Sequence, residues 1–320
     1  MPLAPAALPL AFRCGQLDAL ARTLLASPAF YPPELRQALG LRLLGNAWAQ
    51  YREDRGLPGR PALVGTEVSA ERDAFLALLA DLLPPGEDLL SPALALVRRT
   101  AIRPLAAEAH DAAQILARDR PLLGEVRDAL AHPSLPSSPL ARTLSLIARL
   151  RYSLDPEAAP LTATAQSPCW ALNLAGAAHG AAFAVTPLAL PCPGLVARRL
   201  FRADVPSEQL PALVADQLGA AVHGVAREIA RLPRAVTLFV ERFPALRGNS
   251  RLRQAWLLLF ALDGLTAAQL ARALPCTKAG AGKLLRQLQG QGLVRSSGPF
   301  APYVPAVRVT VSLPDHGAAA

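Results

Sequence analysis

Apolar and polar positions are most regularly spaced in the last third of the chain. Residues 251–262 are nearly all apolar, and Asp263-Gly264 then supplies the chemistry of a turn. Thr266 is placed to cap a second helix, and Gln269 follows three residues later, which is the spacing of a capping box. The pattern therefore predicts two successive helices, of which the second ends at Pro275.

A third helix follows, and it has one apolar face and one cationic face. Thr277 is placed to cap this helix and Gly290 to end it. Apolar residues recur at i, i+3, i+4 and i+7, the spacing of one buried stripe: Ala281, Leu284, Leu285 and Leu288. At about 100° per residue, the opposite face carries Ala279, Lys283, Arg286 and Gln287. Residues 293–295 and 303–304 then predict two strands of a β-hairpin.

This arrangement resembles the winged helix-turn-helix of bacterial regulators of the MarR, ArsR or IclR kind. The resemblance is carried by four segments, which are Leu270–Leu274, the turn Pro275-Cys276-Thr277, Leu284–Leu288 and Gly292-Leu293-Val294. It implies that the third helix contacts the major groove of double-stranded DNA. Winged helices host many functions, so the resemblance indicates the fold more closely than the biological role.

The resemblance and the cationic face together predict a DNA-binding surface. Lys283, Arg286 and Gln287 would lie in or along the major groove, and the turn at 296–300 would touch the minor groove or the DNA backbone. Phosphate contacts would come from Lys283, Arg286 and the polar or cationic residues around them, namely Arg251, Arg253, Arg272, Thr277, Lys278 and Arg295. Gly280 and Gly282 offer no side chain to a base edge, which favours phosphate contacts over sequence reading.

The distribution of charge also points to a polyanionic partner. The chain has a net charge of +9, but residues from 234 onward hold eleven Arg and Lys against three Asp and Glu. Residues 1–233 hold 22 against 21. A general preference for arginine, which supplies 31 of the 33 cationic residues, explains the residue type but not this asymmetry. A basic segment on a helix-turn-helix favours DNA.

The rest of the chain predicts an all-α, mainly helical N-terminal part, because little of it alternates with a period of two. Residues 1–15 are expected to be an irregular lead-in broken by prolines. The expected helices, each bounded by proline or glycine, are 16–25, 33–51, 69–83, 88–102, 105–118, 121–131, 139–154 and 206–232. The helix at 206–232 is long enough for a linker or for dimerisation, which makes a homodimer a candidate assembly.

Four segments follow from these patterns. We expect a helical domain over 1–154, and a helical core, linker or dimerisation segment over 155–233, beginning with a connection at 155–168. A winged helix-turn-helix domain is expected over 234–313, and a disordered tail over 314–320.

Residues 170–190 are the most apolar stretch and are about long enough to cross a membrane. Asn173, His179 and Pro187 interrupt this stretch, and polar groups inside a membrane are costly. We therefore expect a buried helix here and no membrane partner.

Cysteine spacing and the N-terminus bear on the compartment. Cys14, Cys169, Cys192 and Cys276 show no short spacing, so the sequence predicts neither a disulfide framework nor a zinc site. Residues 1–12 lack the basic start of a signal peptide, and prolines interrupt them. The sequence therefore predicts a cytoplasmic protein.

No motif predicts catalysis, a cofactor or a metal. Gly280-Ala281-Gly282-Lys283 resembles the end of a phosphate-binding loop, but Thr277 and Leu284 stand where that motif needs glycine and a hydroxyl. Residues 243–251 resemble the Fic signature, with Phe243 in place of the catalytic histidine and Arg247 in place of the acidic residue. His179 and His223, with Cys169 or Cys192, would suit a metal sensor, although isolated histidines on apolar helices are more often core residues.

The leading hypothesis is therefore a DNA-binding transcriptional regulator that is not an enzyme. One alternative is a winged helix that docks a protein, as in bacterial chromosome-segregation complexes. Another is a catalytically inactive Fic-like remnant, since Asn249-Ser250-Arg251-Leu252 resembles a segment that precedes a winged helix in some Fic-associated proteins.

Overall fold

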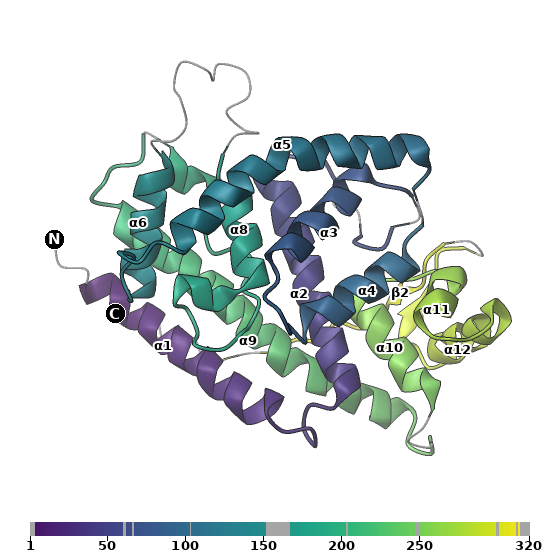
Figure 1. The fold of residues 1–320 in the computed structure, drawn as a ribbon. Coiled ribbons are helices and arrows are strands. Elements are labelled where there is room, and N and C mark those ends of the chain that lie inside the picture. The colour runs from purple at the N-terminus through teal and green to yellow at the C-terminus, as the bar shows by residue number, and fades with distance from the viewer. Residues whose placement is uncertain are drawn as a thin grey trace.

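The computed structural model describes residues 4–59, 62–65, 67–102, 104–151, 167–202, 204–246, 250–298, 301–311 and 313. These residues are mainly helical, as expected, and they contain one small antiparallel sheet of two strands near the C-terminus (Figure 1). The helices are α1 (Ala4–Leu20), α2 (Pro33–Asp54), α3 (Ala70–Leu82), α4 (Leu90–Thr100), α5 (Ala106–Leu130), α6 (Pro139–Arg151), α8 (Cys169–Ala178), α9 (Leu210–Arg242), α10 (Arg251–Leu262), α11 (Ala267–Ala273) and α12 (Lys278–Gly290). The strands are β1 (Val294–Arg295) and β2 (Val304–Pro305), and short helical turns occupy Ala21–Leu25, Gly180–Phe183 and Arg198–Phe201.

Helices α2 and α9 form the framework of the molecule (Figure 1). α2 packs against α4, α8, α9 and α10, and α9 packs against α1, α2, α6 and α10. Every residue of α2 from Leu39 to Leu44 is buried, as expected for a helix that is enclosed on all sides. At Gly40 a Cβ atom would lie 2.2 Å from the carbonyl oxygen of Leu89, so the close packing of this helix requires glycine.

Two predictions about prolines were wrong. α1 begins at Ala4 and includes Pro9, although residues 1–15 were expected to be irregular. α5 is one helix through Pro121, where two helices were expected. A proline removes one helical hydrogen bond, and in both helices buried leucines beyond the proline, such as Leu17 and Leu123, pack into the core and offset that cost.

Pro233 in α9 has a more specific explanation. The expected helix ended at residue 232, but α9 continues to Arg242. A proline at 233 cannot donate to the carbonyl of Ile229, which leaves that oxygen without its helical partner. The hydroxyl of Tyr31 donates to this oxygen at 3.3 Å. The expected domain boundary between residues 233 and 234 therefore falls inside a continuous helix.

Residues 170–178 of the apolar stretch form a buried helix, as expected, whereas residues 179–190 lie outside the α-helix and are only partly buried. Every residue of α8 is buried, and the helix ends before His179. Gly180 packs closely against the backbone at Leu190, because a Cβ atom at position 180 would lie 2.6 Å from the carbonyl oxygen of Leu190. Among the described residues, no helix is both long and apolar enough to span a membrane.

A polar cluster lies within this core. Asn173 donates to Asp54 at 2.7 Å and to the carbonyl of Val196 at 2.8 Å, and the thiol of Cys169 lies 3.4 Å from Asp54. Burial raises the pKa of Asp54 to about 6, although hydrogen bonds from Asn173, Gln50 and Cys169 act to lower it. Asp54 forms no ion pair with any residue that the structure describes. It is therefore a buried carboxyl group held by neutral donors.

Several predictions concern residues outside the described ranges. They are most of the connection at 155–168, the tail at 314–320, residues 247–249 of the Fic-like string, and residues 299–300 of the hairpin turn.

Candidate nucleic-acid interface

The candidate interface is built by the C-terminal unit, which we define as α10 to β2. α10 begins at Arg251, as predicted, where the Ser250 hydroxyl accepts from the backbone N–H of Leu252 at 3.2 Å. It ends at Leu262, and the chain then turns at Asp263, which has φ of 57°, and Gly264, which has φ of 139°. A side chain at Gly264 would collide with Val304, since its Cβ would lie 2.8 Å from Cγ1 of that residue. The turn predicted from Asp263-Gly264 is thus confirmed.

The predicted capping box of α11 is also confirmed. The Thr266 hydroxyl accepts from the N–H of Gln269 at 3.3 Å, and the N–H of Thr266 donates to the Gln269 side chain at 2.8 Å. The sequence did not show a further role of Gln269. Its amide nitrogen donates to the carbonyl of Gly65 at 2.8 Å, which joins α11 to the loop between α2 and α3.

α12 has the two faces that the sequence predicted. Thr277 caps it by accepting from the N–H of Gly280 at 3.1 Å. Ala281, Leu285 and Leu288 are buried and Leu284 is partly buried, so the apolar stripe packs inward against α10 and α11. One detail was wrong: α12 includes Gly290, and the left-handed residue that follows the helix is Gly292, with φ of 69°.

The hairpin is short but paired. Val294 lies opposite Pro305, and Arg295 opposite Val304. Leu265, between α10 and α11, joins the sheet through two hydrogen bonds with Tyr303, of 3.0 and 2.9 Å. This pairing ties the hairpin to the start of α11, so that helices and strands form one unit.

The cationic side chains of α12 point to solvent. Lys278, Lys283, Arg286 and Gln287 are exposed, as is Arg295 on β1. None of these five side chains has a hydrogen bond or ion pair with any described residue. Arg308 is a further exposed cation after β2, also without a partner in the described ranges. Arg308 was counted in the net charge of the segment from residue 234, but no sequence motif predicted that it belongs to the site.

Other predicted contact residues are engaged within the protein. Nε and Nη2 of Arg272 donate to the carbonyl of Thr100 at 3.1 and 2.8 Å. In return, Arg99 donates to the carbonyl of Ala273 at 3.2 Å. Each arginine thus satisfies a carbonyl at the C-terminal end of the other's helix, where such groups lack helical partners. This exchange fixes α11 against α4.

Two arginines of α10 also have partners. Arg251 donates to the carbonyl of Pro275 at 2.6 Å, which holds the turn between α11 and α12. Arg253 forms an ion pair with Glu34 at the start of α2. The structure therefore groups Lys278, Lys283, Arg286 and Arg295 as unpaired cations and separates them from Arg251, Arg253 and Arg272.

Arg42 forms a buried ion pair within the helical body and also links that body to the unit through Asp263, whose side chain is largely exposed. Arg42 of α2 binds both carboxylate oxygens of Glu228 in α9, at 3.1 and 3.2 Å, and Asp263 at 2.9 Å. Burial acts to lower the pKa of Arg42, but Glu228 and Asp263 outweigh it, and the pKa is raised. Asp263 is the only acidic residue among the described residues of the unit, and it faces Arg42 instead of the cations of α12.

The other candidate chemistries find little support in the geometry. The described residues contain no group of three or more His, Cys, Asp or Glu side chains that could hold a metal, including around His179 and His223. Leu284, which replaces the hydroxyl residue of a phosphate-binding loop, packs against the core. No family model matches the chain, and no curated protein sequence matches it significantly.

Proposed function

We propose that the C-terminal unit is a winged helix-turn-helix and that the protein binds double-stranded DNA through α12, as a transcriptional regulator. The observation that carries this proposal is the outward face of α12, where Lys278, Lys283 and Arg286 have no carboxylate partner among the described residues. Unpaired cations on one face of an exposed helix are suited to neutralise phosphates. Arg295 and Arg308 add two cations on the hairpin and the segment that follows it.

The position of α12 supports the same function. α12 lies at one end of the molecule, away from α6 and the N-terminus (Figure 1). A duplex can therefore approach the helix from outside. The fixed attachment of α11 to α4 and of Asp263 to Arg42 holds α12 at a set angle to the helical body. Such a body would present the helix to the groove without a flexible linker.

Protein docking is a second candidate, because Gly280 and Gly282 of α12 offer no side chain to a base edge. Each glycine lowers helix stability by about 1 kcal/mol relative to alanine. At Gly282 a Cβ would meet only Nη1 of Arg286, at 3.7 Å, so the fold has room for alanine. Glycine at such a position allows the backbone of a partner to approach closely, whether that partner is DNA or protein.

Fluorescence anisotropy with a labelled DNA duplex, across a salt series, tests the proposal. If the five unpaired cations each neutralise a phosphate, log K should fall against log salt with a slope of about −4.5. Lys283→Glu/Arg286→Glu should weaken binding and make the slope shallower by about 2. Its control is Arg127→Glu/Arg149→Glu, which reverses the same charge on exposed residues of α5 and α6 and should leave the slope unchanged.

Two results would overturn the proposal. The first is a wild-type protein that binds no duplex even at low salt, which would leave α12 as a protein-docking surface to be pursued by pull-down. The second is an equal loss of binding in both double variants. That result would show attraction by net charge alone, without a role for α12.

A further inference from the structure

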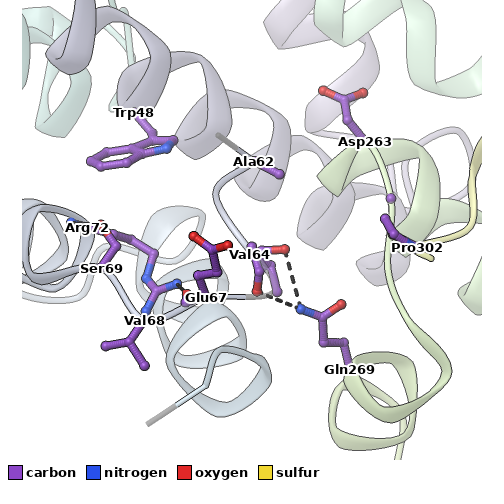
Figure 2. Close-up of a pocket in the computed structure, with 12 residues that line it drawn as sticks. Trp48, Ala62, Val64, Glu67, Val68, Ser69, Arg72, Asp263, Gln269 and Pro302 are labelled. Atoms are coloured by element: carbon purple, nitrogen blue, oxygen red, sulfur yellow. Dashed lines mark hydrogen bonds between the residues drawn. The ribbon is translucent and has the colours of Figure 1, made fainter. Parts of the chain in front are cut away.

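A cavity of about 450 Å³ lies where the helical body meets the C-terminal unit (Figure 2). The helical body lines it with Trp48, Arg72 and residues of the loop before α3, namely Ala62, Val64, Gly65, Glu67, Val68 and Ser69. Asp263, Gly264, Gln269 and Pro302 line it from the C-terminal unit. Its volume falls within the range of small-molecule sites, which are about 300–1,000 Å³. It is separate from the outward face of α12, so the inference below does not rest on DNA binding.

The carboxylate of Glu67 is the free charge in this cavity. Figure 2 shows it between Trp48 and Gln269, directed into the opening. It has no hydrogen bond or ion pair with any described residue. The remaining lining near it is largely apolar, with Trp48, Ala62, Val64, Val68 and Pro302. A carboxylate among apolar walls favours a ligand that combines a positive charge with an apolar body.

The one cation in the lining is already neutralised. Arg72 is 1% exposed, and its guanidinium donates to Asp73 at 3.2 and 3.1 Å. It also donates to the backbone carbonyl of Glu67 at 3.2 Å. At the rim, Asp263 adds a second carboxylate, which is shared with Arg42. The charge left for a ligand is therefore negative, which disfavours an anion.

We propose that this junction cavity binds a small organic cation, with an amidinium, guanidinium or amine group on the Glu67 carboxylate and a flat apolar body against Trp48 and Val64. The guanidinium of Arg52 already lies over the Trp48 ring, 5.2 Å from its centroid, so Trp48 offers the ligand an apolar surface and Glu67 offers the charge. The surface that would hold the apolar body lies next to Gln269. The side chain of Gln269 completes the capping box of α11 and also donates to the carbonyl of Gly65. A ligand here contacts both sides of the junction and stabilises their association.

The test uses three ring compounds of similar shape and different charge, which are benzamidine, benzamide and benzoate. Each is titrated into the full-length ¹⁵N-labelled protein, and the indole N–H signals of the three tryptophans are followed by NMR. Trp48 lines the cavity, whereas Trp170 and Trp256 are buried elsewhere in the core and serve as internal controls. Trp48→Phe assigns the signal.

Benzamidine is expected to shift the Trp48 signal saturably and at lower concentration than benzamide, and benzoate to leave it unchanged. Glu67→Gln should raise the Kd for benzamidine at least about fivefold, the effect of losing an ion pair of about 1 kcal/mol. Glu125→Gln, the same change on an exposed residue of α5, should leave the Kd unchanged.

Three outcomes would overturn the proposal. One is preferential binding of benzoate, which would place the ligand on Arg72. Another is a Kd for benzamidine that Glu67→Gln leaves unchanged. The last is a Trp48 signal that none of the three compounds shifts. Because the Glu67 side chain is exposed and has no partner among the residues that the structure describes, its replacement leaves folding intact, and each outcome reports on binding.

Discussion

Arg272 and Arg286 are residues of one kind in neighbouring helices of the same unit, yet the structure gives them opposite surroundings. Arg272 donates twice to the carbonyl of Thr100. Arg286 is exposed and has no partner within the described residues. Both residues carry the same charge in the sequence, and both were predicted to contact DNA. A cation therefore becomes a candidate for binding a partner only where the fold leaves it unpaired.

The same contrast holds for the unit as a whole. Its inner side is fixed by Arg42 of α2, which forms a buried ion pair with Glu228 of α9 and a partly exposed one with Asp263 at the turn. Its outer side, the face of α12, makes no polar contact with the part of the protein that the structure describes. We therefore expect changes on the inner side to alter stability, and changes on the outer side to alter binding.

Arg42→Leu should have the largest effect on stability. It leaves the buried carboxylate of Glu228 with only Arg231, at 3.4 Å. Removing one partner of a buried ion pair costs about 3–5 kcal/mol, which urea unfolding followed by circular dichroism can measure. Arg42→Leu/Glu228→Leu should recover much of the loss. A loss below about 1 kcal/mol in the single variant, typical of an exposed ion pair, would contradict the inner side's structural role.

Asp54 is also a buried carboxyl group, but among the described residues it has no cation of the kind that Glu228 has in Arg42. Its pKa is raised from 3.8 to about 6, so the fold favours the neutral form. The contribution of Asp54 to the free energy of unfolding is fully present below pH 3.8, and it is lost as the pH rises through about 6. The expected loss is about 3 kcal/mol, at 1.36 kcal/mol per pKa unit.

The measurement is the free energy of unfolding as a function of pH, for the wild type and Asp54→Asn. The variant should lack this part of the pH dependence. Asp128→Asn, at an exposed aspartate of α5, should retain it. If Asp54→Asn has the wild-type profile, the carboxyl group of Asp54 does not titrate in this range.

Arg272→Gln and Arg286→Gln test whether the two arginines differ in role, one in stability and the other in binding. Arg272→Gln should lower the free energy of unfolding by about 1–2 kcal/mol, because it removes charged hydrogen bonds to Thr100. It should leave the salt dependence of DNA binding unchanged. Arg286→Gln should change stability by less than about 0.5 kcal/mol and make the salt slope shallower by about 1. The reverse assignment would show that Arg272 leaves Thr100 to contact DNA.

Gly282→Ala tests how closely a partner approaches the backbone of α12. It should stabilise α12 by about 1 kcal/mol, since its Cβ has room. Gly124→Ala in α5 is the matched control, because a Cβ there meets nothing within 4 Å. If DNA approaches the backbone of α12 closely, only Gly282→Ala should weaken binding in the anisotropy assay. Equal affinity of both variants would exclude such close contact at this position.

Much of the C-terminal unit could be predicted from the sequence, because its signals are local. The capping box joins Thr266 and Gln269, which are three positions apart, and Thr277 caps α12 at the same separation. The apolar stripe of Ala281, Leu285 and Leu288 follows from the helical repeat alone. Each of these features depends on neighbours within two turns of helix, so a single sequence contains the information.

Tertiary structure alone decided which cations are free and where a cavity forms. Arg272 and Thr100 are 172 residues apart, and Arg42 and Glu228 are 186 apart. No spacing rule predicts contacts across such distances. The same reason applies to Pro233, which a helix tolerates because Tyr31 supplies the missing donor, and to Glu67, whose unpaired carboxylate faces residues of the C-terminal unit. The sequence determined the helices and their faces, and packing determined which polar groups remained without a partner.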